Sequence, residues 1–123
     1  MDDYRFNRAS LINAGFQVAR KHAHFDYIVM HDVDLLPVNQ ELRYEYPGRG
    51  SALHIASPKL HPKYHYENFV GGILALTVED FELVDGLSNR YWGWGLEDDE
   101  FYLRMKQGGI EIIRPQVIFF WQN

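Results

Sequence analysis

The sequence lacks several features that mark common protein classes. It contains no cysteine, which excludes a disulfide framework and any thiolate metal site. Basic residues are not in excess, since 12 Lys and Arg stand against 17 Asp and Glu and give a formal net charge of −5. Domains that bind DNA or RNA normally carry a basic patch, so no nucleic-acid partner is expected.

Long apolar runs are also missing. No stretch approaches the ~20 consecutive apolar residues that cross a bilayer, and the acidic residues 1–4 lack the layout of a signal peptide. The chain instead has a high aromatic content of 15%, which suits a sugar-binding surface or, alternatively, a tyrosine-rich core. Its length predicts one domain spanning residues 1–123.

The spacing of apolar residues predicts an α/β fold. Apolar side chains recur at steps of three and four between Ala9 and Ala19, which predicts a helix over residues 6–22. A capping box at residues 77–80 predicts a short helix, and residues 97–107 predict another that ends at two glycines.

Four short segments rich in strand formers alternate with these helices, and they are residues 27–30, 52–56, 72–77 and 110–113. The first is a continuous apolar run, which predicts a strand buried on both faces. Alternating strands and helices predict a largely parallel sheet. Such a sheet normally begins with a strand, so we expect a further strand upstream of residue 6.

Asp32 and Asp34 directly follow the first predicted strand. Period-two geometry points both carboxylates the same way, and ligands of open α/β sheets bind at the C-terminal ends of strands. Oxygen ligands suit Mg²⁺ or Mn²⁺ that bridge to a substrate's phosphates. The pattern therefore favours a metal site over its alternative, a solvated turn.

A Trp-Gly-Trp-Gly loop at residues 92–95 runs directly into four acids, residues 97–100. Acids at a helix N-terminus are favoured by the helix dipole, which explains one or two of them structurally. The loop favours function, because it could fold an aromatic face over a sugar and set a carboxylate beside its hydroxyl.

Two weaker signals remain. The pair His61 and His65 suggests a metal, but Pro62 disfavours the helix that would align them, so a tyrosine-lined acceptor wall is preferred. The adjacent glycines Gly71 and Gly72 could let a ligand approach the backbone, or could form an ordinary turn.

Four motifs, in this order and spacing, resemble the β-1,4-galactosyltransferase family. They are residues 6–9 (Phe-Asn-Arg-Ala), 32–34 (Asp-Val-Asp), 69–72 (Phe-Val-Gly-Gly) and 92–99 (Trp-Gly-Trp-Gly-Leu-Glu-Asp-Asp). The resemblance runs from about residue 4 to residue 115. Within the family, residues 30–37, 61–66 and 96–101 are most similar to members that add galactose to xylose on proteoglycans.

The resemblance implies a GT-A fold, with a Rossmann-like nucleotide-sugar-binding sheet flanked by helices, and an inverting transfer from UDP-galactose that needs Mn²⁺. It implies a xylosylated proteoglycan core protein as acceptor, in glycosaminoglycan linker synthesis. It also implies a place in the Golgi lumen within a single-pass type II membrane protein whose anchor is not in this chain.

The resemblance also assigns roles to individual residues. Phe6 and Arg8 would contact the nucleotide, Asp32 and Val33 the donor, and Asp34 the metal. Asp98 would be the catalytic base. The remaining implied contacts are Gly72 with the donor, Trp94 with donor and acceptor, Tyr64 and Tyr66 with xylose, and Glu97 and Asp99 with sugar hydroxyls.

Two departures from the family pattern predict that the fold is incomplete at both ends. The upstream strand and nucleotide-binding segment, and a downstream His-x-His-like motif with further metal ligands, are not in this chain, and residues 116–123 diverge from the family. One alternative is therefore a non-catalytic fragment that keeps acceptor binding. Another is an unrelated metal-dependent phosphohydrolase that uses Asp32 and Asp34.

Overall fold

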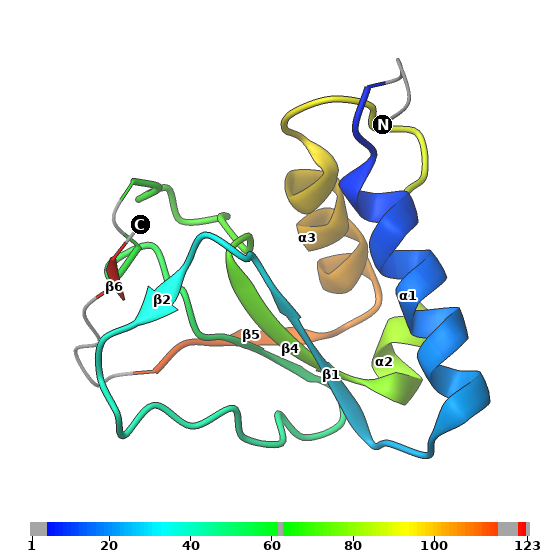
Figure 1. Ribbon diagram of the computed structural model, residues 1–123, viewed down its shortest axis with the longest axis horizontal. Coiled ribbons are helices and arrows are strands. Elements are labelled where there is room, and N and C mark those ends of the chain that lie inside the picture. Colours follow the sequence, from blue (N-terminus) through cyan, green and yellow to red (C-terminus); the bar gives the residue numbers. More distant parts are fainter. Residues whose placement is uncertain (1–4, 62, 116–120, 123) are drawn as a thin grey trace.

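A computed structural model describes residues 5–61, 63–115 and 121–122 (Figure 1). Its elements, in chain order, are α1 (Arg8–His22), β1 (Tyr27–His31), β2 (Leu36–Pro37), β3 (Ser51–His54), β4 (Ile73–Thr77), α2 (Val78–Leu83), α3 (Glu97–Gln107), β5 (Glu111–Ile113) and β6 (Trp121–Gln122). The three predicted helices and four predicted strands are confirmed, with bounds shifted by one or two residues. The predicted divergence of residues 116–123 falls mostly outside the described residues.

The prediction of a largely parallel sheet is wrong, because two of the three strand pairs are antiparallel. The order of the strands is β1-β4-β3-β5, with β4 antiparallel to both β1 and β3, and only β3 and β5 pair in parallel. The chain returns from β3 to β4 through residues 55–72, where the structure describes residues 55–61 and 63–72 and none of these is helical. Without a crossover helix, this connection leads into an antiparallel neighbour.

The strand buried on both faces is β4, whose five residues are all buried, and not β1 as predicted. In β1 only Met30 is buried, because among the described strands β1 pairs on one side alone. The continuous apolar run of residues 27–30 therefore reflects an outer strand whose side chains are half-covered.

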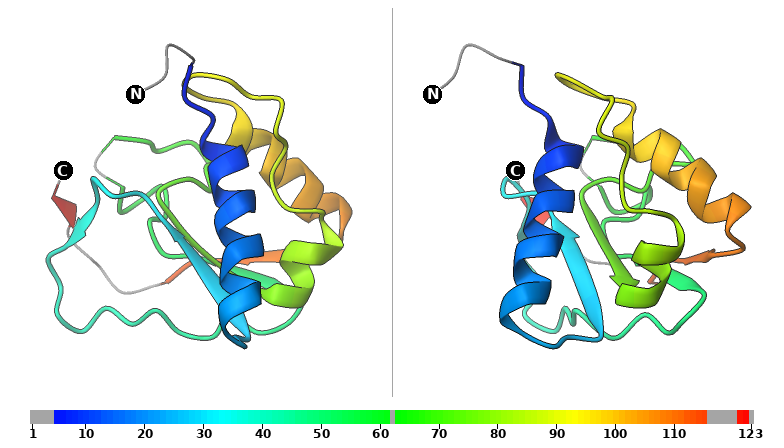
Figure 2. Two further views of the ribbon diagram at one scale, coloured as in Figure 1. Left: turned by 45° about the vertical axis from the view of Figure 1, so that its right-hand side comes forward. Right: turned by 90° about the vertical axis from the view of Figure 1, so that its right-hand side faces the viewer.

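Helices cover one face of the sheet, and loops cover the other (Figures 1 and 2). Phe16 of α1, Phe81 of α2 and Phe101 of α3 pack with Leu74 and Leu76 of β4 in the larger core. Ile73 faces the opposite side, with Leu35, Ile55 and Ala56 in a smaller cluster. None of the helices in the described part has the length and apolar character needed to cross a bilayer.

Local signals set the helix ends. The Asn7 side chain accepts from the Ser10 N–H at 2.9 Å and starts α1. Thr77 Oγ1 accepts from the Asp80 N–H at 3.1 Å and starts α2, as the capping box predicts. No side chain caps α3, which follows Leu96 in a left-handed conformation with φ 74°. The four acidic residues 97–100 form the first turn of α3.

Candidate active site

Four element ends lie near one another, between the centre and the upper right of Figure 1. They are the N-termini of α1, α3 and β4 and the C-terminus of β1. The Asp32 N–H after β1 donates to the Gly72 carbonyl before β4 at 2.8 Å. A small pocket here is lined by residues from all four segments, among them Arg8, Gly71, Gly72 and Asp98.

Arg8 joins the predicted donor and acceptor residues. Its Nε and Nη2 both donate to Asp32 Oδ1, at 3.0 and 2.6 Å. Its Nη1 lies 3.7 Å from Glu97 Oε1 on α3. The three side chains are partly buried, so the charges are less screened than on an open surface. Arg8 thereby fixes the end of β1 against the first turn of α3.

The Asp98 carboxyl group lies against the backbone of Gly71. A Cβ added at Gly71 would sit 2.6 Å from Asp98 Oδ2, so only glycine leaves room for this carboxylate. Burial, together with the neighbouring charges of Glu97 and Asp99, raises the pKa of Asp98 from 3.8 to about 6. A carboxylate with that pKa, at a pocket, has the character of a general base near neutral pH.

Aromatic side chains form a wall beside Asp98. The rings of Tyr64 and Trp94 have centroids 6.2 Å apart, and the Tyr66 hydroxyl donates to Asp99 Oδ1 at 2.9 Å. Burial and this hydrogen bond raise the pKa of Tyr66 above its usual range. Phe69, which is buried, contacts both tyrosine rings from behind. The predicted acceptor residues Tyr64, Tyr66, Trp94, Asp98 and Asp99 therefore lie together.

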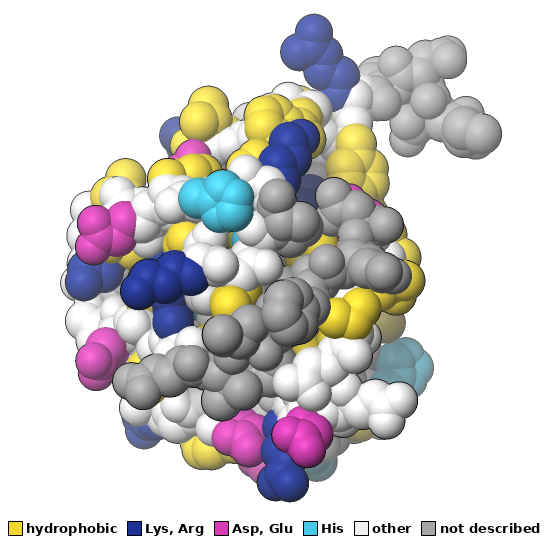
Figure 3. All heavy atoms as spheres, turned by 90° about the vertical axis from the view of Figure 1, so that its left-hand side faces the viewer, with side chains coloured by type: hydrophobic (Ala, Val, Ile, Leu, Met, Phe, Trp, Pro, Cys, Tyr) yellow, Lys and Arg dark blue, Asp and Glu magenta, His cyan; other side chains and the backbone are white. Residues whose placement is uncertain are grey.

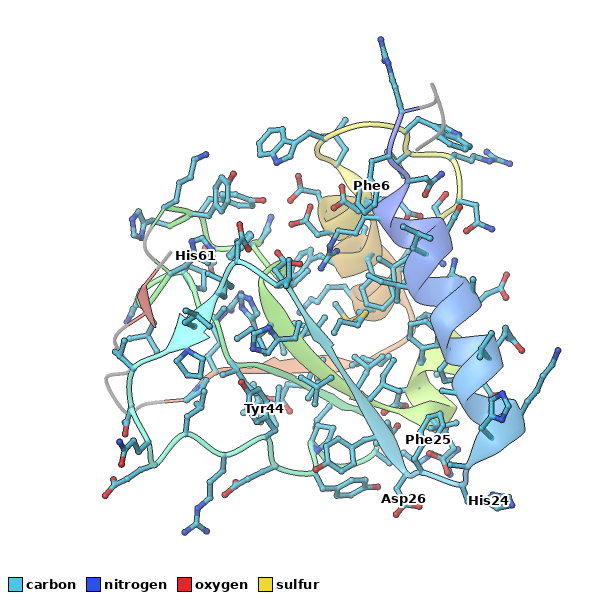
Figure 4. All side chains as sticks on the ribbon, in the orientation of Figure 1. Phe6, His24, Phe25, Asp26, Tyr44 and His61 are labelled. Atoms are coloured by element: carbon cyan, nitrogen blue, oxygen red, sulfur yellow. The ribbon has the colours of Figure 1, made fainter. Side chains whose placement is uncertain are left out.

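The Trp-Gly-Trp-Gly loop stands above this wall, with Trp94 85% exposed. Gly93 and Gly95 have φ values of 89° and 99°, which side chains other than glycine rarely adopt. The Gly93 N–H donates to the Phe6 carbonyl at 2.7 Å. Figure 4 shows Phe6 near the start of α1 and His61 farther along the same side of the molecule. Because Trp94 is exposed and lies beside Tyr64, its indole is open to a ligand.

Asp34 and Val33 are both exposed, in contrast to Asp32, which Arg8 engages. A carboxylate oxygen is the ligand type that Mn²⁺ accepts, so Asp34 fits one position of a manganese site. Among the residues that the structure describes, no group of three or more His, Asp or Glu side chains could hold a metal ion. The pairing of Asp32 with Arg8 also weakens the phosphohydrolase alternative, which needs both aspartates.

The His61 and His65 side chains bind backbone groups. Nδ1 of His61 accepts from the Lys63 and Tyr64 N–H groups, at 3.0 Å each, and His65 Nδ1 lies 2.7 Å from the Pro58 carbonyl. Burial lowers the pKa of His61. These contacts shape the loop that carries Tyr64 and Tyr66, and the acceptor wall remains a prediction.

The face formed by the loops opposite the helices carries charges of both signs. On the part of this face that Figure 3 colours by residue type, Lys and Arg side chains are interspersed with Asp and Glu. At the pocket, by contrast, the Arg8 guanidinium lies between the carboxylates of Asp32 and Glu97.

Comparison with known proteins identifies the family. A family model for the N-terminal domain of galactosyltransferase matches residues 51–120, more than half of the chain, and one for the N-terminal region of glycosyl transferase group 7 matches residues 1–47. A β-1,4-galactosyltransferase 7 from Drosophila melanogaster is 62% identical over 118 residues, or 96% of this chain and 36% of that protein. The chain belongs to the β-1,4-galactosyltransferase family.

Two further members show what similar proteins act on or bind. A xylosylprotein 4-β-galactosyltransferase from Caenorhabditis elegans is 58% identical over 113 residues, covering 92% of this chain and 39% of that protein. The crystal structure of a Drosophila β-1,4-galactosyltransferase 7 mutant in complex with manganese, UDP-Gal and xylobiose superposes with a TM-score of 0.87. It is 60% identical and covers 96% of this chain and 49% of that one.

This β-1,4-galactosyltransferase chain thus spans about a third of the length of these relatives and half of the crystallised chain. The sheet, with helices on one face, has the arrangement of the catalytic domain of that structure, the GT-A fold. The mixed strand directions described above are those of this family fold.

Sequence reasoning missed one residue that shapes the site. His54 is fully buried at the end of β3 and hydrogen-bonds the Gly71 carbonyl at 2.8 Å. Its signal in the sequence is a titratable side chain inside the apolar strand of residues 52–56, two positions after the buried Ala52 and on the same face. A polar residue at such a position needs a partner, and the sequence alone does not say which one.

Proposed function

We propose that this chain forms the central part of a catalytic domain that transfers galactose from UDP-galactose to the 4-hydroxyl of a β-xyloside. The observation that carries the proposal is the Asp98 carboxyl group, which packs against Gly71 next to the Phe69 ring. The same Phe69 ring supports Tyr64 and Tyr66, and Trp94 lies beside Tyr64. The xylose-linked names of the similar proteins support the choice of acceptor.

In this proposal Asp98 is the catalytic base. Its carboxylate accepts the proton of the xylose 4-hydroxyl, whose oxygen forms a bond to C1 of galactose. The bond from C1 to the UDP oxygen breaks on the opposite face, so UDP leaves and the configuration at C1 inverts. A pKa of about 6 keeps Asp98 mostly ionised at neutral pH yet basic enough to hold a proton in the transition state.

The acceptor sugar would lie on the aromatic wall. Tyr64 and Trp94 offer apolar ring faces that suit a sugar ring, and Trp94 is exposed enough to be covered by one. Glu97 and Asp99 would accept hydrogen bonds from sugar hydroxyls. Tyr66 holds Asp99 at 2.9 Å and so orients that carboxylate for the task.

The donor would lie across Arg8 and Asp32, with Phe6 and Val33 exposed beside the nucleotide and Gly72 at the floor. Asp34 would hold Mn²⁺. When bound, this ion supplies Lewis-acid stabilisation of the departing diphosphate. The positive guanidinium of Arg8 would also stabilise the negative charge of the departing diphosphate, because Asp32 holds it in place before the donor arrives.

The biological partners follow from the same proposal. They are UDP-galactose and a xylosylated proteoglycan core protein, met in the Golgi lumen by a membrane-anchored enzyme. This assignment rests on the family and on the relatives' acceptors.

The test of the acceptor compares initial rates of galactose transfer to a β-xyloside and to N-acetylglucosamine, at equal concentration, with UDP-galactose and Mn²⁺. Transfer to the xyloside alone is the expected result. Equal rates on both acceptors would contradict the xylose assignment.

The test of the base is Asp98→Asn, which keeps the size of the side chain but cannot accept the proton. The expected loss in kcat is ~10²- to 10⁴-fold, with UDP affinity intact. Glu100→Gln is the matched control, because Glu100 belongs to the same acidic run yet pairs with Arg104 at 2.7 and 2.9 Å, away from the pocket. If Asp98→Asn and Glu100→Gln have similar kcat values, Asp98 is not the base.

Within the part of the chain that the structure describes, Asp34 belongs to no group of three metal-ligating side chains, and this favours a second candidate, an acceptor-binding protein without turnover. It predicts xyloside binding that needs neither Mn²⁺ nor UDP, together with no galactose transfer. Calorimetry with the xyloside in the presence and absence of Mn²⁺ and UDP separates the two functions, and Asp34→Ala should abolish only the Mn²⁺-dependent part of UDP binding.

A further inference from the structure

His54 is a fully buried histidine that makes one side-chain hydrogen bond to the residues that the structure describes. Its Nε2 lies 2.8 Å from the Gly71 carbonyl oxygen. A carbonyl oxygen only accepts, so Nε2 carries the proton and Nδ1 does not. Nδ1 is buried and has no partner among the described residues. Burial lowers the pKa of His54 to about 4, so the ring is neutral throughout the range in which Asp98 titrates.

The carbonyl that His54 contacts belongs to a strained turn. The Ile73 N–H donates to the same Gly71 oxygen at 3.0 Å, across Gly72 with φ 77°. A γ-turn with positive φ at its centre is the rarer and more strained of the two forms. Strained backbone persists where the surroundings over-determine it. His54 supplies a second donor to this oxygen from a neighbouring strand.

The turn is the junction between the proposed donor and acceptor halves of the site. The Gly72 carbonyl accepts from the Asp32 N–H at 2.8 Å on the donor side. Gly71 forms the surface against which Asp98 Oδ2 packs, and a Cβ there would be 2.6 Å from that oxygen. A shift of Gly71 by a few tenths of an ångström therefore changes how closely Asp98 is shielded from water.

A side chain also holds the His54 ring itself. The Phe69 ring meets it edge-on, with centroids 5.3 Å apart and planes at 72°. Phe69 is buried and also contacts Tyr64 and Tyr66. The ring that fixes His54 is thus the ring that supports the acceptor wall.

We propose that His54 is a positioning residue for the Asp98 carboxylate and acts through the Gly71–Gly72 turn. The proposal rests on the base role proposed above for Asp98. Removal of the Nε2–H donor lets the turn relax, and water then reaches Asp98. Since burial is the largest cause of the raised pKa of Asp98, hydration lowers that pKa toward its ordinary value.

The experiment measures the titration of Asp98 by ¹³C NMR of its carboxyl carbon, which needs no turnover. His54→Leu removes the Nε2–H donor and fills the buried position with an apolar side chain. His54→Gln retains an N–H group that can reach the Gly71 oxygen. We expect the Asp98 midpoint to fall by roughly half a pH unit or more in His54→Leu and to return in His54→Gln. His24→Gln is the control and should leave the midpoint unchanged, because His24 is exposed between α1 and β1, at the end of the molecule opposite to the pocket (Figure 4).

The same variants are assayed for turnover. In the free enzyme the acid limb of kcat/KM reports the base, so it should move with the Asp98 midpoint in His54→Leu and recover in His54→Gln. An unshifted midpoint in a folded His54→Leu protein overturns the proposal, as does an equal shift in His54→Gln. If the midpoint moves but no galactose is transferred, the positioning role stands and the proposed function fails.

If His54→Leu does not fold, the coupling between His54 and Asp98 can be measured from the other side, by substituting Asp98 and observing His54. Coupling between two groups acts equally in both directions. In the Asp98→Asn protein, which leaves His54 intact, the ¹⁵N and ¹H shifts of the His54 Nε2–H group should differ from those of the unsubstituted protein at pH 7. They should match at pH 5, where both the Asp98 carboxyl group and the His54 ring are mostly neutral. Identical shifts at both pH values would overturn the proposal.

Discussion

Replacing Asp98 by Asn should stabilise the protein at neutral pH and not at acidic pH. The folded protein raises the pKa of Asp98 from 3.8 to about 6, mainly through burial. A group whose pKa is raised on folding contributes stability below its unfolded pKa and loses it as the pH rises through its folded pKa. The ionised Asp98 carboxylate therefore destabilises the fold above pH 6, and a neutral Asn removes that cost.

The magnitude follows from the size of the shift. A difference of about 2 pH units corresponds to about 3 kcal/mol at 1.36 kcal/mol per unit. Asp98 is only partly buried, so solvent screening reduces the pH-dependent gain to about 1 to 2 kcal/mol between pH 4 and pH 7.5. Any constant effect of the substitution, such as a changed hydrogen bond, cancels when the two pH values are compared.

The assay is urea unfolding of both proteins at pH 4, 5.5 and 7.5, with free energies of unfolding from linear extrapolation. Asp98→Ala serves as a second variant, because it also removes the carboxyl group but has a different constant effect. Both variants should show the same pH-dependent gain. A free-energy difference from the unsubstituted protein that is equal at pH 4 and pH 7.5 would show that the site does not hold Asp98 in its neutral form.

Three other substitutions test separate contacts. Gly71→Ala places a Cβ 2.6 Å from both Asp98 Oδ2 and Phe69 Cε2, so it should destabilise the fold by about 1 to 3 kcal/mol and lower kcat; an unchanged melting temperature would contradict this packing. Tyr66→Phe removes the donor to Asp99 and should raise KM for the xyloside about fivefold, the value of roughly 1 kcal/mol, without changing UDP affinity. Arg8→Lys should weaken UDP-galactose binding in calorimetry, because a lysine ammonium cannot contact Asp32 and Glu97 together as the guanidinium does. An unchanged affinity would mean that a single positive charge at this position is sufficient.

Local structure was the part that the sequence predicted best. The third helix was expected over residues 97–107 and spans Glu97–Gln107, because its glycine-rich flanks and apolar spacing are local signals. The start of the short helix α2 was also predicted, since a capping box needs only neighbouring residues. The prediction that strand 27–30 is buried on both faces was wrong, because an apolar run does not show how many other strands its strand pairs with.

The site was predicted partly from motifs and partly from the family resemblance. The placement of Asp32 at a strand end and of residues 97–100 after a glycine-rich loop came from the residues themselves. The assignment of roles came from the resemblance, which the family match supports at the level of the family. Neither route pointed to His54, whose partner lies 17 positions away in the sequence.

By itself, the sequence predicted the helices and the strands of the four-stranded sheet to within one or two residues at their ends, and its motifs pointed to the family, because these depend on neighbouring residues and on motif order. Only the tertiary structure decided the antiparallel direction of β4, the joining of Asp32 to Glu97 through Arg8, and the packing of Asp98 against Gly71. These depend on contacts between segments far apart in the chain. The pKa of Asp98 belongs to the same group, because burial is its largest cause and a side chain is buried only once the sheet and α3 have packed together.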